Sequence, residues 1–245
     1  MRVRFRFTKL GKVRWTSHRD VARMWERALR RAALPVTYTG GFTPRPKVAF
    51  GLALPTGHES VAEYLDVELA DASLDVVALP ARLSAALPVG VDVLAAAEVD
   101  AKEASLQELV SSSEWDVEAV GVEESEVRSL VSRALDAETL VITRERKGAE
   151  VVDDVRPGII SVSVLGPPPC VAEGYEAHTP GAQLRCELRT QPRGLRPSEL
   201  LRAIGPELSE GHVRRLNQWI ERDGARWEPL PVGATDARHA VARAS

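Results

Sequence analysis

The residues of this chain best suited to bind a ligand are basic, and they gather in its first 50 positions. Residues 1–50 hold thirteen Lys and Arg against two acidic residues, a net charge of +11. Residues 51–100 have a net charge of −8, while the whole chain is nearly neutral at −3. So steep a charge gradient favours a polyanionic partner, and RNA is the partner we expect.

The first basic residues alternate with apolar ones, which predicts a strand over residues 2–7, because successive side chains of a strand point to opposite faces. The apolar face is expected to contact helices and consists of Val3, Phe5 and Phe7. The basic face is expected to be open to solvent and consists of Arg2, Arg4 and Arg6. Three cations about 7 Å apart along a strand suit a phosphate backbone. A solvated face without a ligand is the alternative.

A second basic stripe lies on the helix predicted to follow this strand. Ser17 is a favoured N-cap and Asp20 resembles the acidic end of a capping box, so the helix is predicted from about His18 to Ala33. Basic residues recur along it at Arg19, Arg23, Arg27 and Arg30. Too few acids lie nearby to neutralise them, and repulsion between like charges costs a few tenths of a kcal/mol per pair. A negatively charged partner would remove that repulsion.

The loop of residues 40–47 combines flexible and stiff positions. Its two glycines allow close approach of the backbone to a ligand, and its two prolines restrict the chain. The side chains that it would display are Phe42, Arg45 and Lys47. An aromatic ring beside cations suits stacking on a base while phosphates are held. A hairpin connector with Phe42 in the core is the other interpretation.

Signals for catalysis are weak in comparison. His18 could contact phosphate or act as a general base, or it could simply follow the N-cap with no catalytic role. The sequence contains no Walker loop, dinucleotide fingerprint, nucleophile elbow or cysteine cluster. Its histidines and cysteines lack metal-ligand spacing. We therefore expect a non-catalytic protein without metal or cofactor.

The elements that must position these residues follow a regular order. Residues 1–100 are predicted as strand, helix, strand, strand, helix, strand, the ferredoxin-like βαββαβ pattern, with both helices on one face of an antiparallel sheet. Residues 101–112 are predicted to be a linker, and residues 113–232 a second, decorated domain of the same kind with a short helical segment at 212–220. Residues 233–245 are predicted to be a flexible tail. The expected fold class is α+β, with two ferredoxin-like domains in tandem.

The expected location is the cytoplasm, with no membrane contact. No apolar run reaches the ~18–20 residues that would span a bilayer. The basic start of the chain is not followed by the apolar stretch of a signal peptide. Cys170 and Cys186 fit a reducing compartment.

Four segments between Arg4 and Leu69 together match a known bacterial family. They are RFRFTKLGKVRWTSHRD, ERALRRAALP, GGFTPRPKVAFGLALPTGHES and AEYLDVEL. The most specific parts are Ser17, His18 and Asp20, and the block at residues 41–47. This stretch resembles the radical-SAM-associated domain, a domain of unknown function that is fused to, or encoded beside, a cobalamin-binding radical-SAM enzyme.

The resemblance implies that the chain is an accessory partner of a radical-SAM enzyme encoded nearby, in a reaction on tRNA or rRNA. The chain has no CxxxCxxC cluster, so the iron–sulfur cofactor would belong to that enzyme. Two alternatives stay open. One is a metal-independent RNA-processing endonuclease of tandem ferredoxin-like type, with a histidine as base. The other is a protein-interaction module whose basic face docks on an acidic enzyme surface.

Overall fold

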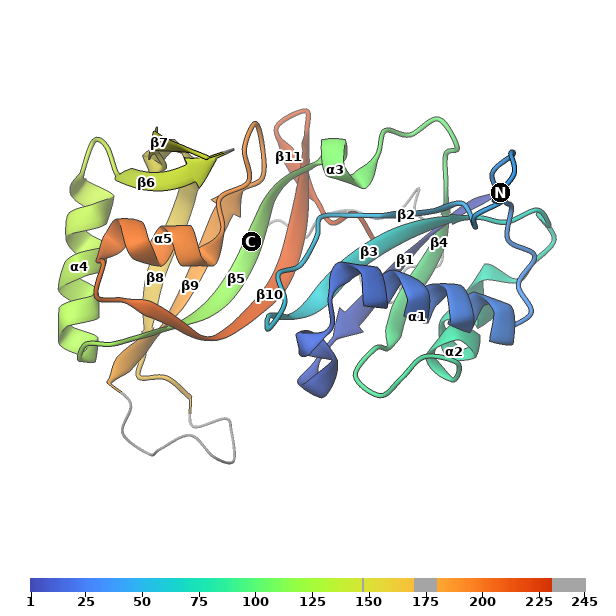
Figure 1. The fold of residues 1–245 in the computed structure, drawn as a ribbon, viewed down its shortest axis with the longest axis horizontal. Helices are drawn as coiled ribbons and strands as arrows, with labels where there is room; N and C mark the ends of the chain where they lie inside the picture. The colour runs from blue at the N-terminus through green and yellow to red at the C-terminus, as the bar shows by residue number, and fades with distance from the viewer. Residues whose placement is uncertain (147, 170–179, 231–245) are drawn as a thin grey trace. The chain divides into compact units, whose positions relative to one another are not determined.

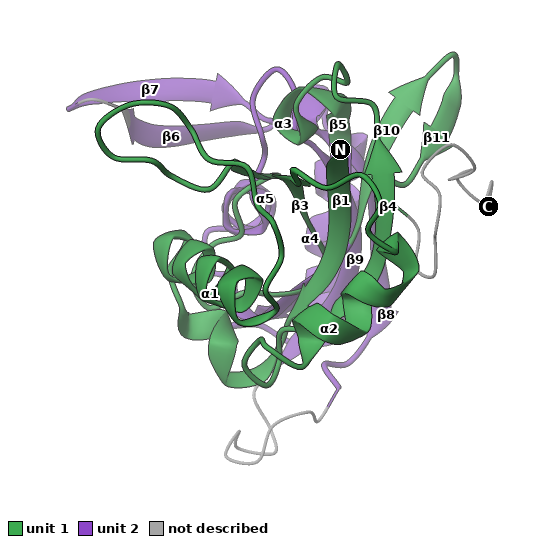
Figure 2. Ribbon diagram, turned by 90° about the vertical axis from the view of Figure 1, so that its right-hand side faces the viewer, with its two compact units in different colours: residues 1–111, 217–245 green, residues 112–216 purple. Residues whose placement is uncertain are grey.

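The computed structural model of the protein describes residues 1–146, 148–169 and 180–230 (Figure 1). The chain divides into two compact units (Figure 2). Unit 1 comprises Met1–Ser111 and Asn217–Ser245, and unit 2 comprises Ser112–Leu216. The segment from Asn217, which we expected in the second domain, thus belongs with the N-terminal part of the chain. The tail expected at 233–245 lies outside the described residues.

Unit 1 is built on an antiparallel sheet. Its strands are β1 (Arg2–Lys9), β2 (Val48–Phe50), β3 (Glu59–Glu68), β4 (Val93–Val99) and β11 (Ala225–Trp227), with the end of β10 (Ser209–Arg222). β1 lies between β3 and β4, and β2 pairs with β3. In this register Arg4 is opposite Asp66 on β3 and Ala97 on β4.

Helix α1 (His18–Arg31) begins where the sequence predicts, because the Ser17 hydroxyl accepts a hydrogen bond from the Asp20 backbone N–H. The other helical segments of unit 1 are η1 (Gly11–Trp15), η2 (Val76–Ala78), α2 (Leu79–Ser84) and α3 (Leu106–Leu109). Helix α2 begins just before Pro80, because proline has no N–H to donate and fits only the first turn of a helix.

The main core of unit 1 lies between the sheet and helices α1 and α2, which cover one face of β1, β3 and β4 (Figure 1). As predicted, the apolar residues of β1 face these helices. Trp25 of α1 packs against Phe5 and Phe7, with ring centroids 5.8 and 5.0 Å apart. Each aromatic side chain of this kind buries 150–250 Å² of surface, so the three rings hold α1 firmly on the sheet.

The opposite face of this sheet is covered too, which corrects the open face that we expected. Its small core consists of Ala62, Tyr64, Ala95, Ala97, Leu106 and Leu230. Leu106 comes from α3, within the expected linker, and Leu230 comes from the segment after β11. Sequence periodicity shows that a strand has two faces but not which remote segment covers each.

Unit 2 is also α+β, with antiparallel strand pairs. Its strands are β5 (Val110–Val120), β6 (Val141–Arg146), β7 (Ala149–Asp154), β8 (Ile159–Gly166), β9 (Gly181–Arg189) and the first part of β10. Its helices are α4 (Glu124–Asp136), η3 (Arg156–Gly158) and α5 (Pro197–Ile204). β9 pairs with β5 and β8, β10 neighbours β5, and β6 and β7 form a separate hairpin.

The helical segment predicted at 212–220 is wrong, because these residues lie in strand β10. The apolar residues at 213, 216 and 220 recur at helical spacing. In the strand, Val213 and Arg215 are buried, and then Gln218 and Ile220, so the alternation shifts by one residue. The shift falls where β10 passes from unit 2 to unit 1, between Leu216 and Asn217. That change of surroundings hid the two-residue period.

Among the described residues, no helix combines the length and apolar character needed to cross a membrane.

Candidate nucleic-acid interface

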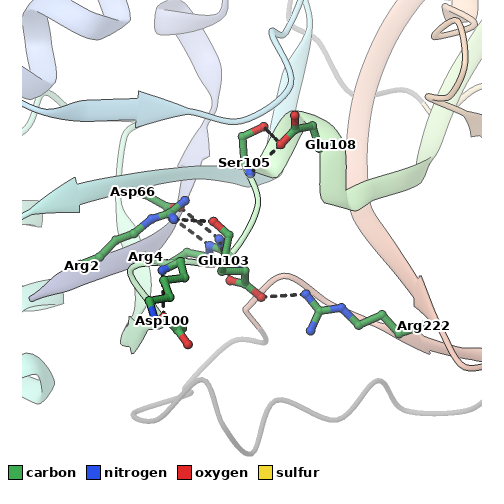
Figure 3. A network of polar contacts seen from close by, with 9 residues as sticks. Arg2, Arg4, Asp66, Asp100, Glu103, Ser105, Glu108 and Arg222 are labelled. Atoms are coloured by element: carbon green, nitrogen blue, oxygen red, sulfur yellow. Dashed lines mark hydrogen bonds and ion pairs between the residues drawn. The ribbon is translucent and has the colours of Figure 1, made fainter.

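Two arginines of β1, Arg2 and Arg4, belong to a largely buried network of ion pairs (Figure 3). Arg4, only 1% exposed, donates from Nε to Asp66 Oδ1 at 2.8 Å and from Nη2 to Asp66 Oδ2 at 3.0 Å. It also pairs with Glu103 at 3.1 Å, while Arg2 donates from Nε to Asp66 Oδ2 at 2.9 Å. A buried charge needs such partners, because isolated ions are costly to remove from water.

Arg6 is buried by different partners. Its guanidinium pairs with Glu228 at 2.9 Å, donates to Asn217 Oδ1 at 3.3 Å and lies 5.8 Å from the ring centroid of Tyr64. Burial raises the pKa of Tyr64, so its phenol stays neutral. The expected solvent-exposed row of Arg2, Arg4 and Arg6 is therefore corrected: Arg4 and Arg6 are buried, Arg2 is partly buried, and carboxylates compensate all three charges.

The second stripe, on α1, is exposed as the sequence predicts. Its residues are Arg19, Arg23, Arg27 and Arg30. Arg23 pairs with Asp20 at 3.5 Å, whereas no described residue forms an ion pair with the other three. A hydrogen bond from the Ser17 hydroxyl is the main cause that lowers the pKa of Asp20, so this acid is ionised at neutral pH. Among the described residues, an ion pair thus compensates only one of the four cations, Arg23.

The loop at residues 40–47 is displayed outward. Phe42 is fully exposed, so the interpretation that places it in the core is wrong. Arg45 is exposed as well, and no described residue forms an ion pair with it. Lys47 lies at the base of the loop and pairs with Glu68 at 2.7 Å. Of the three side chains expected to contact RNA, two are free to do so.

One exposed aromatic residue was not identified from the sequence as a candidate for the interface. Trp15 of η1 is 64% exposed, and the Arg14 guanidinium lies 5.2 Å from its ring centroid. A Cβ on Gly57 would lie 3.0 Å from the Trp15 ring, so this position accommodates only glycine without a shift. The signal was present as a basic–aromatic pair, Arg14 and Trp15, inside the basic segment.

His18 does not lie in a substrate-sized site. Its ring is exposed and packs edge-on against Phe50, with ring centroids 5.1 Å apart. It lines a cavity of about 20 Å³ together with Lys9 and Glu63, which has room for about one water molecule. Lys9 Nζ donates to the Thr16 carbonyl at 3.0 Å. This geometry holds the start of α1 and offers no space for a nucleotide.

Metal ligands were not expected, and the described residues contain no group of three or more His, Cys, Asp or Glu that could hold a metal ion. Cys186 is buried, and burial raises its pKa, so it is a neutral thiol. Cys170 lies outside the described residues.

Residues 2–196 match a family described as an uncharacterized protein conserved in bacteria (DUF2344). The chain belongs to this family. Its members are thus bacterial proteins of unknown function, as the resemblance implied. No curated protein matches the chain.

Several solved structures are similar to this chain. A chain of a Cbf5-Nop10-Gar1 complex matches with a TM-score of 0.50 at 11% identity, covering 88% of this chain and 48% of the other. A chain of an H/ACA RNP bound to a substrate RNA containing 2'-deoxyuridine matches with a TM-score of 0.43 at 11% identity, over 90% and 48%. A chain of an archaeal box H/ACA sRNP Nop10-Cbf5 complex gives 0.44 at 10%, over 87% and 46%. This DUF2344 chain thus spans about half the length of the chains it matches. At such low sequence identity the comparison bears on the fold and not on function.

Proposed function

We propose that this DUF2344 protein is an accessory RNA-binding protein that presents tRNA or rRNA to a radical-SAM enzyme. The observation that carries RNA binding is the exposed basic stripe of α1, whose charges are largely uncompensated. The identity of the partner enzyme rests on the resemblance of Arg4–Leu69 to radical-SAM-associated domains.

Electrostatics supports this assignment. Residues four apart on a helix are separated by about 6 Å along its axis, so Arg19, Arg23 and Arg27 present a regular row of guanidinium groups. Guanidinium groups bind phosphate oxygens through paired N–H donors. Binding would also remove the repulsion between neighbouring arginines.

The set of RNA-binding residues that we propose is narrower than the basic segment. It consists of Arg19, Arg23, Arg27, Arg30, Phe42 and Arg45, with Lys47 as a lesser contributor because Glu68 already pairs with it. The three arginines of β1 have a structural role instead. Each would have to break its ion pair with a carboxylate before it could bind phosphate; they are Arg2, Arg4 and Arg6.

We also propose that both units are ferredoxin-like. In unit 1 the chain order is β1, α1, β2, β3, α2, β4, and the sheet order is β4-β1-β3 with β2 on β3. In unit 2 the order is β5, α4, β8, β9, α5, β10, with β9 between β5 and β8. Strand, helix, strand, strand, helix, strand with antiparallel pairing is the ferredoxin-like pattern, and the β6–β7 hairpin is an insertion.

The test of RNA binding is its salt dependence. The triple variant Arg19→Ala/Arg23→Ala/Arg27→Ala should bind RNA more weakly, and the slope of log K against log salt should fall by about 2 for single strands. The matched control replaces three exposed arginines on helices of unit 2, Arg128, Arg133 and Arg202, by alanine. Both variants lose three positive charges, so an equal effect would point to net charge instead of this stripe. Absence of RNA binding by the wild type at low salt would contradict the proposal.

The partner is tested by co-purification with the radical-SAM enzyme encoded nearby. We expect the complex to contain RNA and to weaken when nuclease is added. A complex that is RNA-free and indifferent to nuclease would favour the protein-interaction alternative.

A further inference from the structure

The feature that extends the proposed function furthest is the tip of the loop at residues 40–47, which indicates the kind of RNA bound. Phe42 is fully exposed there, although burial of so large an apolar side chain would stabilise the protein. Gly40 and Gly41 precede it, and Gly41 has φ +109°, a conformation that favours glycine. A Cβ at either glycine would meet no atom within 4 Å, so the tip stands away from the rest of the protein.

The base of the loop, in contrast, is closed by hydrogen bonds. Tyr38 and Pro46 form a β-bridge. The Thr39 N–H donates to the Arg45 carbonyl at 2.8 Å, and the Arg45 N–H donates to Thr39 Oγ1 at 3.0 Å. The Lys47 N–H donates to the Thr37 carbonyl at 2.8 Å. A loop held in this way loses little conformational entropy when its tip binds a ligand.

The chemistry of the tip indicates what it binds. Residues 36–50 contain no acidic residue. Arg45 is exposed, and Tyr38 offers a second, half-exposed ring. Phe42 is fully exposed, so its ring does not pack into an apolar cluster. Exposed rings and a cation on the same loop match nucleobases and their phosphates better than they match an apolar protein surface.

We infer that Phe42 stacks on an unpaired base, and that the RNA is therefore single-stranded where it meets this loop. The inference rests on the proposed RNA-binding function and adds the kind of RNA. In a duplex both faces of each base are stacked on neighbouring bases, so the Phe42 ring has no face to contact. Arg45, three residues away, holds the adjoining phosphate.

The test measures the affinity of the full chain for a single-stranded RNA and for a duplex of the same length, by fluorescence anisotropy. Phe42→Ala should weaken binding of the single strand about 5- to 140-fold, the range expected for one stacked base. Phe42→Trp should retain binding because indole also stacks. Phe42→Leu should lose nearly as much as alanine, because it keeps apolar area without a flat ring. Duplex binding should be weaker and insensitive to Phe42→Ala.

A control and a spectroscopic readout make the test specific. Val89→Ala removes another exposed apolar side chain of unit 1 and should change nothing. A 2-aminopurine base in the RNA should change its fluorescence on binding the wild type and not on binding Phe42→Ala. Because Phe42 lies outside the core, its variants should melt at the temperature of the wild type.

The outcomes separate the two proposals. No binding of any RNA at low salt would overturn the proposed function itself. RNA binding that is unchanged in Phe42→Ala, or equal for single strand and duplex, would overturn only the inference. Loss of the partner enzyme in Phe42→Ala with RNA binding unchanged would also overturn it, since the ring would then contact protein.

Discussion

At the scale of single residues, Arg4 donates two hydrogen bonds to the Asp66 carboxylate in the interior of unit 1, at 2.8 and 3.0 Å. Asp66 also accepts from Arg2, and Glu103 forms an ion pair with Arg4 and accepts from Arg222 (Figure 3). Removal of one partner from such a network leaves the other charged and buried, which costs far more than the intact pair contributes. The basic face of β1 is thus a structural feature of this DUF2344 protein.

Arg4→Ala should lower the free energy of unfolding by about 3–5 kcal/mol, the range for breaking a buried ion pair, because Asp66 and Glu103 lose a partner in the interior. Urea denaturation followed by circular dichroism measures this. Arg45→Ala, which removes an exposed arginine without an ion pair to the described residues, should stay within about 0.5 kcal/mol of the wild type. A loss below about 1 kcal/mol for Arg4→Ala would mean that water reaches this network.

At the scale of elements, α1 contributes both to the hydrophobic core and to the basic surface. One side of the helix packs Val21, Trp25, Ala28 and Leu29 into the core. The other side carries the arginine stripe. The helix is held at its start by Ser17, whose hydroxyl accepts from the Asp20 N–H at 3.2 Å and donates to Asp20 Oδ2 at 2.7 Å. The stripe therefore depends on a local cap as well as on the core.

Ser17→Ala should destabilise the protein by about 1 kcal/mol, the usual cost of a lost N-cap, and should raise the pKa of Asp20 toward its ordinary value. The folded-state pKa of Asp20 is lowered, so its contribution is present at neutral pH and fades as pH falls through the acid range. The penalty should therefore shrink at low pH, where Asp20 is protonated. Unfolding curves at both pH values and an NMR titration of Asp20 measure these effects, and Ser17→Thr is the control that keeps the cap. A penalty independent of pH would contradict the Ser17–Asp20 contact.

At the scale of the whole molecule, a segment late in the sequence packs with the N-terminal part of the chain. The segment Asn217–Leu230 belongs to unit 1, supplies Glu228 to Arg6 and places Leu230 in the second small core. Residues more than 200 positions apart thus complete one unit. A fold of this kind cannot be divided at residue 112 without uncovering one face of the first sheet.

Leu230→Ala should cost about 2–5 kcal/mol, as for other buried leucines, because the space left on the sheet is only partly refilled. Hydrogen exchange should increase at the amides of β1 and β3, which lie beneath this core. Val89→Ala, at a position 98% exposed, should leave both measurements unchanged. Unaltered exchange in β1 would show that unit 1 does not need its C-terminal segment.

Much of the candidate interface could be predicted from the sequence, because its signals are local. The cap at Ser17, the arginine spacing of α1 and the glycine–proline pattern of the loop all act within a few residues. Exposure of the stripe follows from the apolar residues that point the other way. The Trp15–Arg14 pair was visible in the sequence as well, but no local pattern showed that the ring is exposed.

By itself, the sequence determined β1 and α1, the two opposite faces of β1 and the concentration of positive charge in α1 and its neighbouring loop. Only the tertiary structure decided which cations are free. Arg4 meets a carboxylate 62 positions away and Arg6 meets one 222 positions away. Long-range pairing also made β10 a strand, since it lies between β3 and β5 in the sheet order. Periodicity and capping depend on near neighbours, whereas burial and charge compensation depend on segments that meet only when the chain has folded.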